Sequence, residues 1–528
     1  MMHSSANRRV RHKICFPCCL VALVLIPLSW EKESFPRSKL SELQPSFSAI
    51  TEETGDSESP TRNRRLVLMD EDNSSSWDIP VRSPALSRRR LANLRGATTT
   101  SDVENAETSK QLIFKESSLY PPTMEATLTV PLHATTGTHH VHVYIGSPPQ
   151  RQTLIVDTGS RLMAFPCRPC NNCGKHASDY YDPIRSTTDV LPKCGNCYLA
   201  ELSMCSNNDQ KCHVTQRYTE GSSWSAYELE DLVWFGNSNL EESIDSFMKL
   251  AVPYSFGCQV EETGLFKDQY ADGILGLAKH GTSLIQAMYD AGSIRNNAFS
   301  LCFTRTGGSL SLGGSYVEQH REPMRFSPLT TTGSGKNMYS VNVVEVRVGD
   351  ICIACSYTSA AGGKNSNSAD REIPETLKIF SDGKGTILDS GTTDTYLPAM
   401  IEPYFIKAWK ETSGMAFSKR KNRYTYKDFQ NLPKITFVLQ GMGEGDEDGV
   451  VFVIKPVAYM EDVPIDATGN VVPWAGTTEL TNRIYLEEQH GAVLGANAML
   501  GYDILFDIGG QRVGMARADC SGSTSVIQ

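Results

Sequence analysis

The 528-residue sequence has little of three things: basic excess, long apolar runs and helical periodicity. Lys and Arg number 50 against 60 Asp and Glu, a net charge of -10, so no basic field favours a nucleic acid as partner. The single long apolar run excludes a polytopic membrane protein. Hydrophobic residues make up 40% and charged residues 21%, which predicts a folded, mostly soluble protein.

The apolar run covers residues 14–30 and follows a short basic stretch. This order is typical of a secretory signal, and a run this short fits either a cleaved signal peptide or an uncleaved anchor. We therefore expect residues 1–30 to direct the chain to the lumen or membrane of the endoplasmic reticulum or Golgi, with secretion or a vacuole as alternatives. Membrane contact is expected only if the segment stays uncleaved.

Residues 31–125 are rich in Ser, Thr, Arg and Pro and carry no sustained period, which predicts a pro-segment or flexible spacer. The sequence Arg-Arg-Leu occurs there twice, at 64–66 and at 89–91. Basic clusters of this kind are either solvated charge or, in a secreted precursor, sites of proteolytic processing.

After residue 128 the sequence pattern changes to short β-branched and aromatic runs separated by Gly, Pro and Asn. This pattern predicts a mostly β protein. The two better helical patterns are at 283–291 and 399–412. Surface loops are expected at 360–372, at 441–448 and in a cysteine-rich stretch, with a polar tail at 521–528. Strands are expected at 140–145, 153–156, 229–235, 340–348 and 434–439.

A weak internal repeat indicates the architecture. Asp157-Thr-Gly-Ser160 follows an apolar strand, and Asp389-Ser-Gly-Thr392 follows another 232 residues later. Each copy has a distant hydrophobic-hydrophobic-Gly partner, at 274–276 and at 493–495. Two such copies predict two β lobes, 126–330 and 331–520, related by an approximate two-fold axis.

The repeat also suggests a chemistry. An Asp that leaves a strand into a Gly-containing turn can be fixed by the flanking hydroxyls. If both turns meet between the lobes, the carboxylates are too close to ionise together, and the pair shares one proton. One carboxyl then activates a water while the other donates to a carbonyl, and neither a cofactor nor a metal is required.

These motifs, with Tyr144-Ile-Gly-Ser-Pro-Pro-Gln150 ahead of the first, resemble those of the pepsin-like aspartic proteases over residues 128–520. The resemblance implies a bilobal, all-β-dominated fold, a monomer, polypeptide substrates, and Asp157 and Asp389 as the catalytic pair. It implies that Thr158, Gly159, Ser160, Ser390, Gly391 and Thr392 support the pair, and that Tyr218, Glu220, Gly221 and Ser222 belong to a flap over the substrate.

The cysteine-rich stretch and the flap sequence Tyr-x-Glu-Gly-Ser resemble plasmepsin V and its protist relatives. That group cuts exported proteins at Arg-x-Leu type motifs in the endomembrane system. The sequence departs from the group in lacking its common C-terminal membrane helix and in having Thr219 at the position of a flap cysteine. Glu220 is the leading candidate to bind a substrate arginine, with Asp179 second; the alternative is that Glu220 faces solvent.

Twelve cysteines lie beyond the apolar segment, and in an oxidising compartment we expect disulfides. A zinc site using His176 or His213 is the alternative for the cysteine-rich insertion at 167–212. The family resemblance suggests a Cys302–Cys520 disulfide, and Cys352 and Cys355 form either a plain bridge or a redox motif. The remaining eight, whose pairing stays open, are Cys167, Cys170, Cys173, Cys194, Cys197, Cys205, Cys212 and Cys258.

The predicted function is an aspartic endopeptidase of the secretory pathway that processes proteins at Arg-containing sites. One alternative is a broad-specificity protease of an acidic compartment. Another is a pseudo-protease that binds peptides without cutting them, whose usual signature is loss of an Asp or a motif glycine. Asp157, Asp389, Gly159 and Gly391 are all present.

Cutting of the pro-segment is expected near Arg64–Leu66 or Arg88–Leu91, because both clusters lie in a stretch without a packing signal. N-terminal sequencing of the purified protein and of an Asp157→Asn variant tests this. Self-processing predicts that the variant keeps the segment, whereas identical N-termini would assign the cut to another protease.

Overall fold

The computed structural model describes residues 124, 126–135, 137–199, 203–206, 208–236, 248–331, 333–356, 373–442, 449–466, 469–521 and 526–527. The chain divides into two units, Met1–Ser117 and Ser118–Gln528, and every described residue belongs to the second. The predictions for the signal segment, the pro-segment, the loop at 360–372 and most of the loop at 441–448 and of the tail lie outside the described residues. Among the described residues no helix has the length and apolarity to cross a bilayer.

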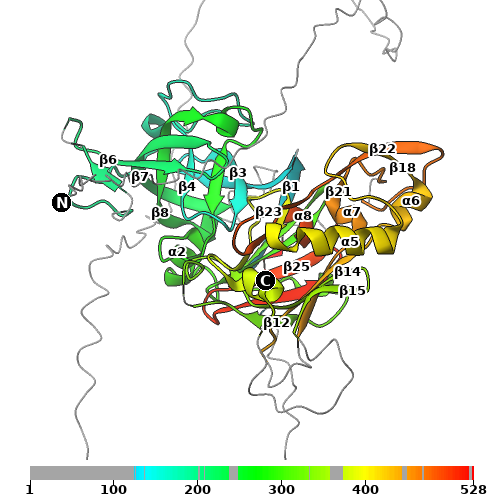
Figure 1. Ribbon diagram of the computed structural model, residues 1–528. Helices are drawn as coiled ribbons and strands as arrows, with labels where there is room; N and C mark the ends of the chain where they lie inside the picture. The colour runs from blue at the N-terminus through cyan, green and yellow to red at the C-terminus, as the bar shows by residue number, and fades with distance from the viewer. Residues whose placement is uncertain are drawn as a thin grey trace, which may run out of the picture. The chain divides into compact units, whose positions relative to one another are not determined.

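The described unit is dominated by strands (Figure 1). In the first half they are β1 Leu128–Thr135, β2 Thr138–Ile145, β3 Gln150–Asp157, β4 Met163–Pro166, β5 Ser203–Cys205, β6 Cys212–Arg217, β7 Ser223–Phe235, β8 Val252–Thr263, β9 Gly273–Gly276, β10 Ala298–Thr304, β11 Gly307–Leu312 and β12 Arg325–Pro328. In the second half they are β13 Ser340–Val341, β14 Val343–Val348, β15 Ile351–Cys355, β16 Thr386–Leu388, β17 Thr395–Pro398, β18 Asn422–Thr425, β19 Ile435–Leu439, β20 Val450–Ile454, β21 Met460–Glu461, β22 Thr477–Asn482, β23 Ile484–Glu488, β24 Ala492–Leu494, β25 Tyr502–Asp507, β26 Arg512–Arg517 and β27 Val526–Ile527. All five predicted strand regions are confirmed.

The helices are short and have local causes. The α-helices are α2 Leu284–Asp290, α4 Glu375–Lys378, α5 Glu402–Ser413, α6 Tyr426–Gln430, α7 Pro456–Tyr459 and α8 Ala496–Met499, and the 3-10 turns are η2 Pro183–Arg185, η3 Met248–Leu250, η4 Gly264–Lys267, η5 Val317–Gln319, η6 Ile379–Ser381 and η7 Ala399–Ile401. Helix α2 begins where the Ser283 hydroxyl accepts a hydrogen bond from the Gln286 amide. Helix α5 ends at Gly414, which takes the left-handed conformation at φ 73°. Both predicted helices are confirmed.

Each half repeats one pairing pattern. In the first half β3 runs parallel to β9, so that Val156 pairs with Leu275, and β4 runs antiparallel to β9. In the second half β16 runs parallel to β24, and β17 antiparallel to it. The glycine of each hydrophobic-hydrophobic-Gly motif is needed where the chains cross. A Cβ at Gly276 would lie 2.4 Å from the Leu162 amide nitrogen, and one at Gly495 2.1 Å from the Asp394 carbonyl oxygen.

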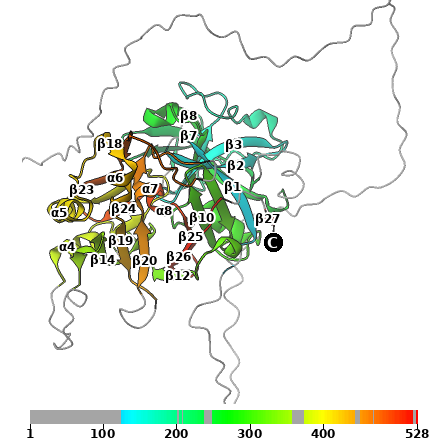
Figure 2. The ribbon, with the colours of Figure 1, turned by 90° about the vertical axis from the view of Figure 1, so that its right-hand side faces the viewer.

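A fifteen-stranded sheet unites most of the first half with the end of the chain. Its strand order is β12-β26-β25-β10-β11-β1-β2-β3-β9-β4-β8-β7-β6-β5, with β27 paired to β1. Strands β25 and β26, which the sequence assigned to the second lobe, therefore pair with β10 and β12 of the first (Figure 2). Separate sheets of five, four and three strands build the rest of the second half.

The twelve cysteines of the described unit form six disulfides, which confirms the disulfide prediction. The pairs are Cys167–Cys258, Cys170–Cys173, Cys194–Cys205, Cys197–Cys212, Cys302–Cys520 and Cys352–Cys355. The suggested Cys302–Cys520 pair closes 218 residues of sequence and ties β10 to the chain after β26.

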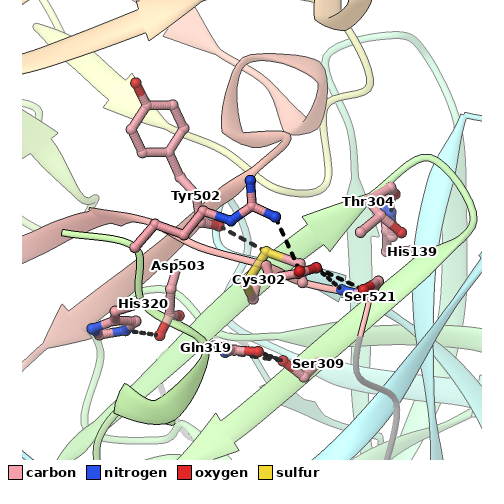
Figure 3. The surroundings of a disulfide bond; sticks show 12 residues. His139, Cys302, Thr304, Ser309, Gln319, His320, Tyr502, Asp503 and Ser521 are labelled. Atoms are coloured by element: carbon pink, nitrogen blue, oxygen red, sulfur yellow. Dashed lines mark hydrogen bonds and ion pairs between the residues drawn. A yellow bond between two sulfur atoms is a disulfide. The ribbon is translucent and has the colours of Figure 1, made fainter. Parts of the chain in front are cut away.

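Polar side chains surround the Cys302–Cys520 bridge (Figure 3). His320 points at Asp503, with 2.7 Å between Nε2 and Oδ2, and the Gln319 and Ser309 side chains face one another. The Asp503 carboxylate is fully buried, so the His320 contact offsets part of the cost of burying it. The bridge and this pair fix the chain terminus against the first lobe.

Candidate active site

Two hydroxyl side chains cross between the lobes beside the aspartates. The Thr158 amide donates to the Ser390 hydroxyl at 3.1 Å, and the Ser390 amide donates to the Thr158 hydroxyl at 2.9 Å. The Thr158 hydroxyl donates to the Leu388 carbonyl, and the Ser390 hydroxyl donates to the Val156 carbonyl, at 2.9 and 2.8 Å. All four bonds are buried, so water does not compete for them. The arrangement joins the residue after each aspartate to the opposite lobe.

The carboxylates are held by matching contacts. Asp157 Oδ1 accepts from the Gly159 amide at 2.8 Å, and Oδ2 accepts from the Ser160 hydroxyl. Asp389 Oδ1 accepts from the Gly391 amide at 3.1 Å, and Oδ2 accepts from the Thr392 hydroxyl at 2.8 Å. Both oxygens of each carboxylate thus accept a hydrogen bond from their own turn.

The motif glycines let the two carboxylates approach one another. A Cβ at Gly391 would lie 2.2 Å from Asp157 Oδ1, and a Cβ at Gly159 would lie 2.6 Å from Asp389 Oδ1. Any side chain at either position would therefore displace the opposite carboxylate. The dyad support residues named from the sequence are all brought together here.

The environment favours a shared proton. Asp157 is 5% exposed. Burial first, and then the negative charge of Asp389, raise the pKa of Asp157 to about 7, although the Ser160 and Gly159 hydrogen bonds pull it down. One carboxyl of the pair is consequently protonated near neutral pH. Such a pair holds an acid and a base side by side.

A hairpin covers the dyad. Strands β6 and β7 are joined by a turn in which the Tyr218 amide donates to the Ser222 carbonyl at 2.9 Å and Gly221 takes φ 97°. The Tyr218 ring packs 5.1 Å from that of Phe266. Burial and then the Asp157 charge raise the pKa of the Tyr218 phenol well above its ordinary value, which places it within electrostatic reach of the dyad.

The indole of Trp224 holds Tyr218, a contact that sequence reasoning missed. Trp224 Nε1 donates to the Tyr218 hydroxyl at 3.2 Å, and Trp224 lies on β7 at the base of the same turn. Ala164, which follows the first motif, belongs to the same hydrophobic cluster as Trp224. The sequence signal that could have indicated this contact is a tryptophan six residues after the flap tyrosine.

The two acidic specificity candidates lie in different places. Glu220 is exposed on the flap turn, two residues from Tyr218. The Asp179 side chain is 90% exposed and 4.0 Å from Arg168. The Asp179 carbonyl accepts from Gln152, which lies five residues before Asp157 on β3, or about 16 Å along a strand. The structure therefore brings Glu220 to the flap, but it does not bring Asp179 to the dyad.

The cysteine-rich insertion lies along the base of the flap. Cys197–Cys212 fastens it to the first residue of β6, and Cys194–Cys205 closes the insertion beside it. The buried Glu228 carboxylate of β7 accepts from the Tyr198 and Leu199 amides at 2.9 and 3.2 Å. Of the two sequence candidates for a metal ligand, His176 instead contacts Glu262 of β8 at 3.1 Å, and His213 contacts Asp209 at 2.7 Å. The insertion thus fixes the strands from which the flap projects.

Comparisons with known proteins agree with this geometry. A family model described as the N-terminal part of xylanase inhibitors matches residues 139–314. Aspartic protease 5 of Toxoplasma gondii is 32% identical over 194 residues, which is 33% of this chain and 19% of that protein. Plasmepsin V of Plasmodium falciparum is 29% identical over 213 residues, 39% of this chain and 35% of that protein. Aspartyl protease AED1 of Arabidopsis thaliana is 24% identical over 396 residues, 73% of this chain and 72% of that protein.

The chain is therefore similar to the pepsin-like aspartic proteases. The matches to aspartic protease 5 and plasmepsin V span 19% and 35% of those two relatives. The match to the plant aspartyl protease, over 396 residues, is longer than the 232 residues that separate the two Asp-hydroxyl-Gly-hydroxyl motifs.

Replacing Trp224 by Phe should loosen the flap. The change removes the indole donor to Tyr218, and one hydrogen bond contributes about 1 kcal/mol, so amide exchange at residues 217–222 should accelerate about five-fold. Hydrogen–deuterium exchange measures this. Trp234→Phe is the matched control, because the buried Trp234 Nε1 has no hydrogen-bond partner among the described residues. Equal acceleration in both variants would contradict a specific role for Trp224.

Proposed function

We propose that the protein is an aspartic endopeptidase, with Asp157 and Asp389 as its catalytic pair. The observation that carries the proposal is the pair itself: two carboxylates, one from each lobe, pressed against the opposite motif glycine and held by the same set of hydrogen bonds. A structural Asp at a strand end needs no partner of this kind. Because the pKa of Asp157 is raised, the pair can hold the proton that the chemistry requires.

The reaction follows from the arrangement. The ionised carboxyl removes a proton from a water held between the two, and that water attacks the carbonyl carbon of the peptide bond. The protonated carboxyl donates to the carbonyl oxygen, which gives a tetrahedral gem-diol without a covalent enzyme intermediate. Proton transfer to the nitrogen then breaks the C–N bond. The Tyr218 flap excludes bulk water above the pair, which strengthens each electrostatic contact.

The natural substrates are proposed to be secretory or exported proteins cut at Arg-containing sites of the Arg-x-Leu type. The exposed carboxylate of Glu220 on the flap turn supports this, because the turn stands over the place where a peptide would lie. A guanidinium that meets this carboxylate in a partly desolvated cleft gains a charge-assisted hydrogen bond. A lumenal endoplasmic reticulum or Golgi location and a monomeric state complete the proposal.

A non-catalytic binding protein is the second candidate, since the description of the matching family model names xylanase inhibitors. Asp157→Asn and Asp389→Asn separate the two functions, because each removes half of the acid–base pair with little change in volume. An endopeptidase should lose all cleavage of a peptide library in either variant, and a statine-type inhibitor should abolish wild-type cleavage. Turnover that survives either substitution would contradict the proposed mechanism.

Glu220→Gln should lower kcat/KM for an Arg-containing peptide by about ten-fold or more, equivalent to roughly 1.4 kcal/mol, and barely change a matched peptide without Arg. The substitution keeps size and removes charge. Glu261→Gln is a suitable control, because Glu261 is also exposed and lies on β8 beside the flap strand β7. Equal losses on both peptides would show that Glu220 supports the flap rather than selecting the substrate.

A further inference from the structure

Three histidine rings gather on one face of the β1–β2 hairpin. His133 of β1 pairs directly with His140 of β2, and His142 lies two residues further along the same face. The ring centroids of His133 are 5.6 Å from those of His140 and 4.7 Å from those of His142, and the last two are 6.3 Å apart. None of this cluster is used by the proposed chemistry.

The rings hold buried nitrogens without partners. His133 Nε2, His140 Nδ1 and His142 Nδ1 are each buried and have no hydrogen-bond partner among the described residues. His140 is 3% exposed. A buried imidazole without a partner for its nitrogen is tolerated while it is neutral, but a proton on that nitrogen adds a charge that nothing there compensates.

The neighbouring groups oppose protonation. Arg151 of β3 acts on His133 and His142 with its positive charge, and the rings act on one another. The Tyr270 ring lies 5.7 Å from that of His140. His139 faces the other side and contacts the Thr304 carbonyl, and its charge also opposes protonation of His140. The nearby carboxylate of Asp272 is committed to the Thr153 and Ser178 amides.

The pKa values of the three histidines are all lowered. Burial first, and then neighbouring positive groups, lower the pKa of His140 to about 4 and that of His142 to about 3, and burial lowers that of His133. An unfolded chain binds these protons below about pH 6.5, whereas the folded chain resists them. The stability that these neutral histidines contribute to the fold is therefore fully present above about pH 6.5. It is lost as the pH falls toward 4.

The hairpin contacts the strand that leads to Asp157 and the loop that follows Asp389. Strand β2 lies beside β3 (Figure 2). His140 of β2 pairs with Ile155, two residues before Asp157. At the hairpin tip the Thr393 hydroxyl donates to the Gly137 carbonyl at 2.6 Å, and Thr393 lies four residues after Asp389. A displacement of this one hairpin would thus disturb both aspartate loops.

We propose that His133, His140 and His142 form an acid-sensing cluster whose protonation disengages the β1–β2 hairpin and withdraws support from both aspartate loops. The cluster would confine the active fold to mildly acidic and neutral surroundings. A transition-metal site is the competing interpretation of three histidines. Arg151 disfavours a cation, and the ring nitrogens do not all lie within 4.8 Å of one another.

Acid unfolding of the full chain, followed by tryptophan fluorescence between pH 7 and 3, tests the proposal without requiring proteolytic activity. His140→Phe keeps a ring against His133 and Tyr270, and His142→Gln keeps a neutral polar group. Each should lower the pH midpoint of unfolding by about 0.5–1 unit, because one titrating group is removed. His490→Gln is the control, since His490 pairs with Asp382 on the surface, and its midpoint should not move. Unchanged midpoints in both cluster variants would overturn the proposal.

Hydrogen–deuterium exchange on the wild-type chain provides a second measurement that needs no variant to fold. As the pH falls from 6.5 to 4, residues 138–145 should lose protection before β10 and β25 do, once rates are corrected for intrinsic pH dependence. Protection at 138–145 that outlasts or matches that of β10 and β25 would equally overturn the proposal.

Discussion

The reciprocal hydrogen bonds between Thr158 and Ser390 are the constraint on which the site depends. Each residue follows a catalytic candidate, and each bonds to the backbone of the opposite lobe. Without them, two buried carboxyl groups that repel one another would move apart, since like charges at close range oppose the arrangement. The motif hydroxyls and glycines are thus mutually dependent: the hydroxyls bring the lobes together, and the glycines leave room for the carboxylates.

Local patterns in the sequence predicted the turns, strands and helices whose causes lie within a few residues. The two Asp-hydroxyl-Gly-hydroxyl turns, the strand at 229–235 and the helix after Ser283 all have causes within a few residues. The Trp224–Tyr218 contact depends on how β7 folds back against Ala164, and the pairing of β25 with β10 joins residues about 200 positions apart. No periodicity specifies such contacts. The histidine cluster was missed for the same reason, because His133 meets His140 only after a hairpin forms.

The inserted cysteines and the histidine hairpin contact different elements of one site. The insertion fastens the base of β6, and its Tyr198 amide donates to the Glu228 carboxylate of β7, so it limits where the flap and Glu220 can stand. Strand β2 of the hairpin pairs with β3, which carries Asp157. Fixing the flap favours selection among peptides, and an acid-sensitive support favours a compartment of moderate pH. Both properties suit a processing enzyme better than a digestive one.

The pH dependence of kcat/KM on a cleavable peptide tests the shared proton most directly. Because the pKa of Asp157 is raised to about 7, we expect kcat/KM to fall tenfold per pH unit above pH 7 as the pair loses its one proton. The profile should be measured over a range in which fluorescence shows the chain to be folded. A value of kcat/KM that stays constant from pH 6 to pH 9 would contradict a protonated carboxyl in the pair, and with it the proposed acid–base mechanism.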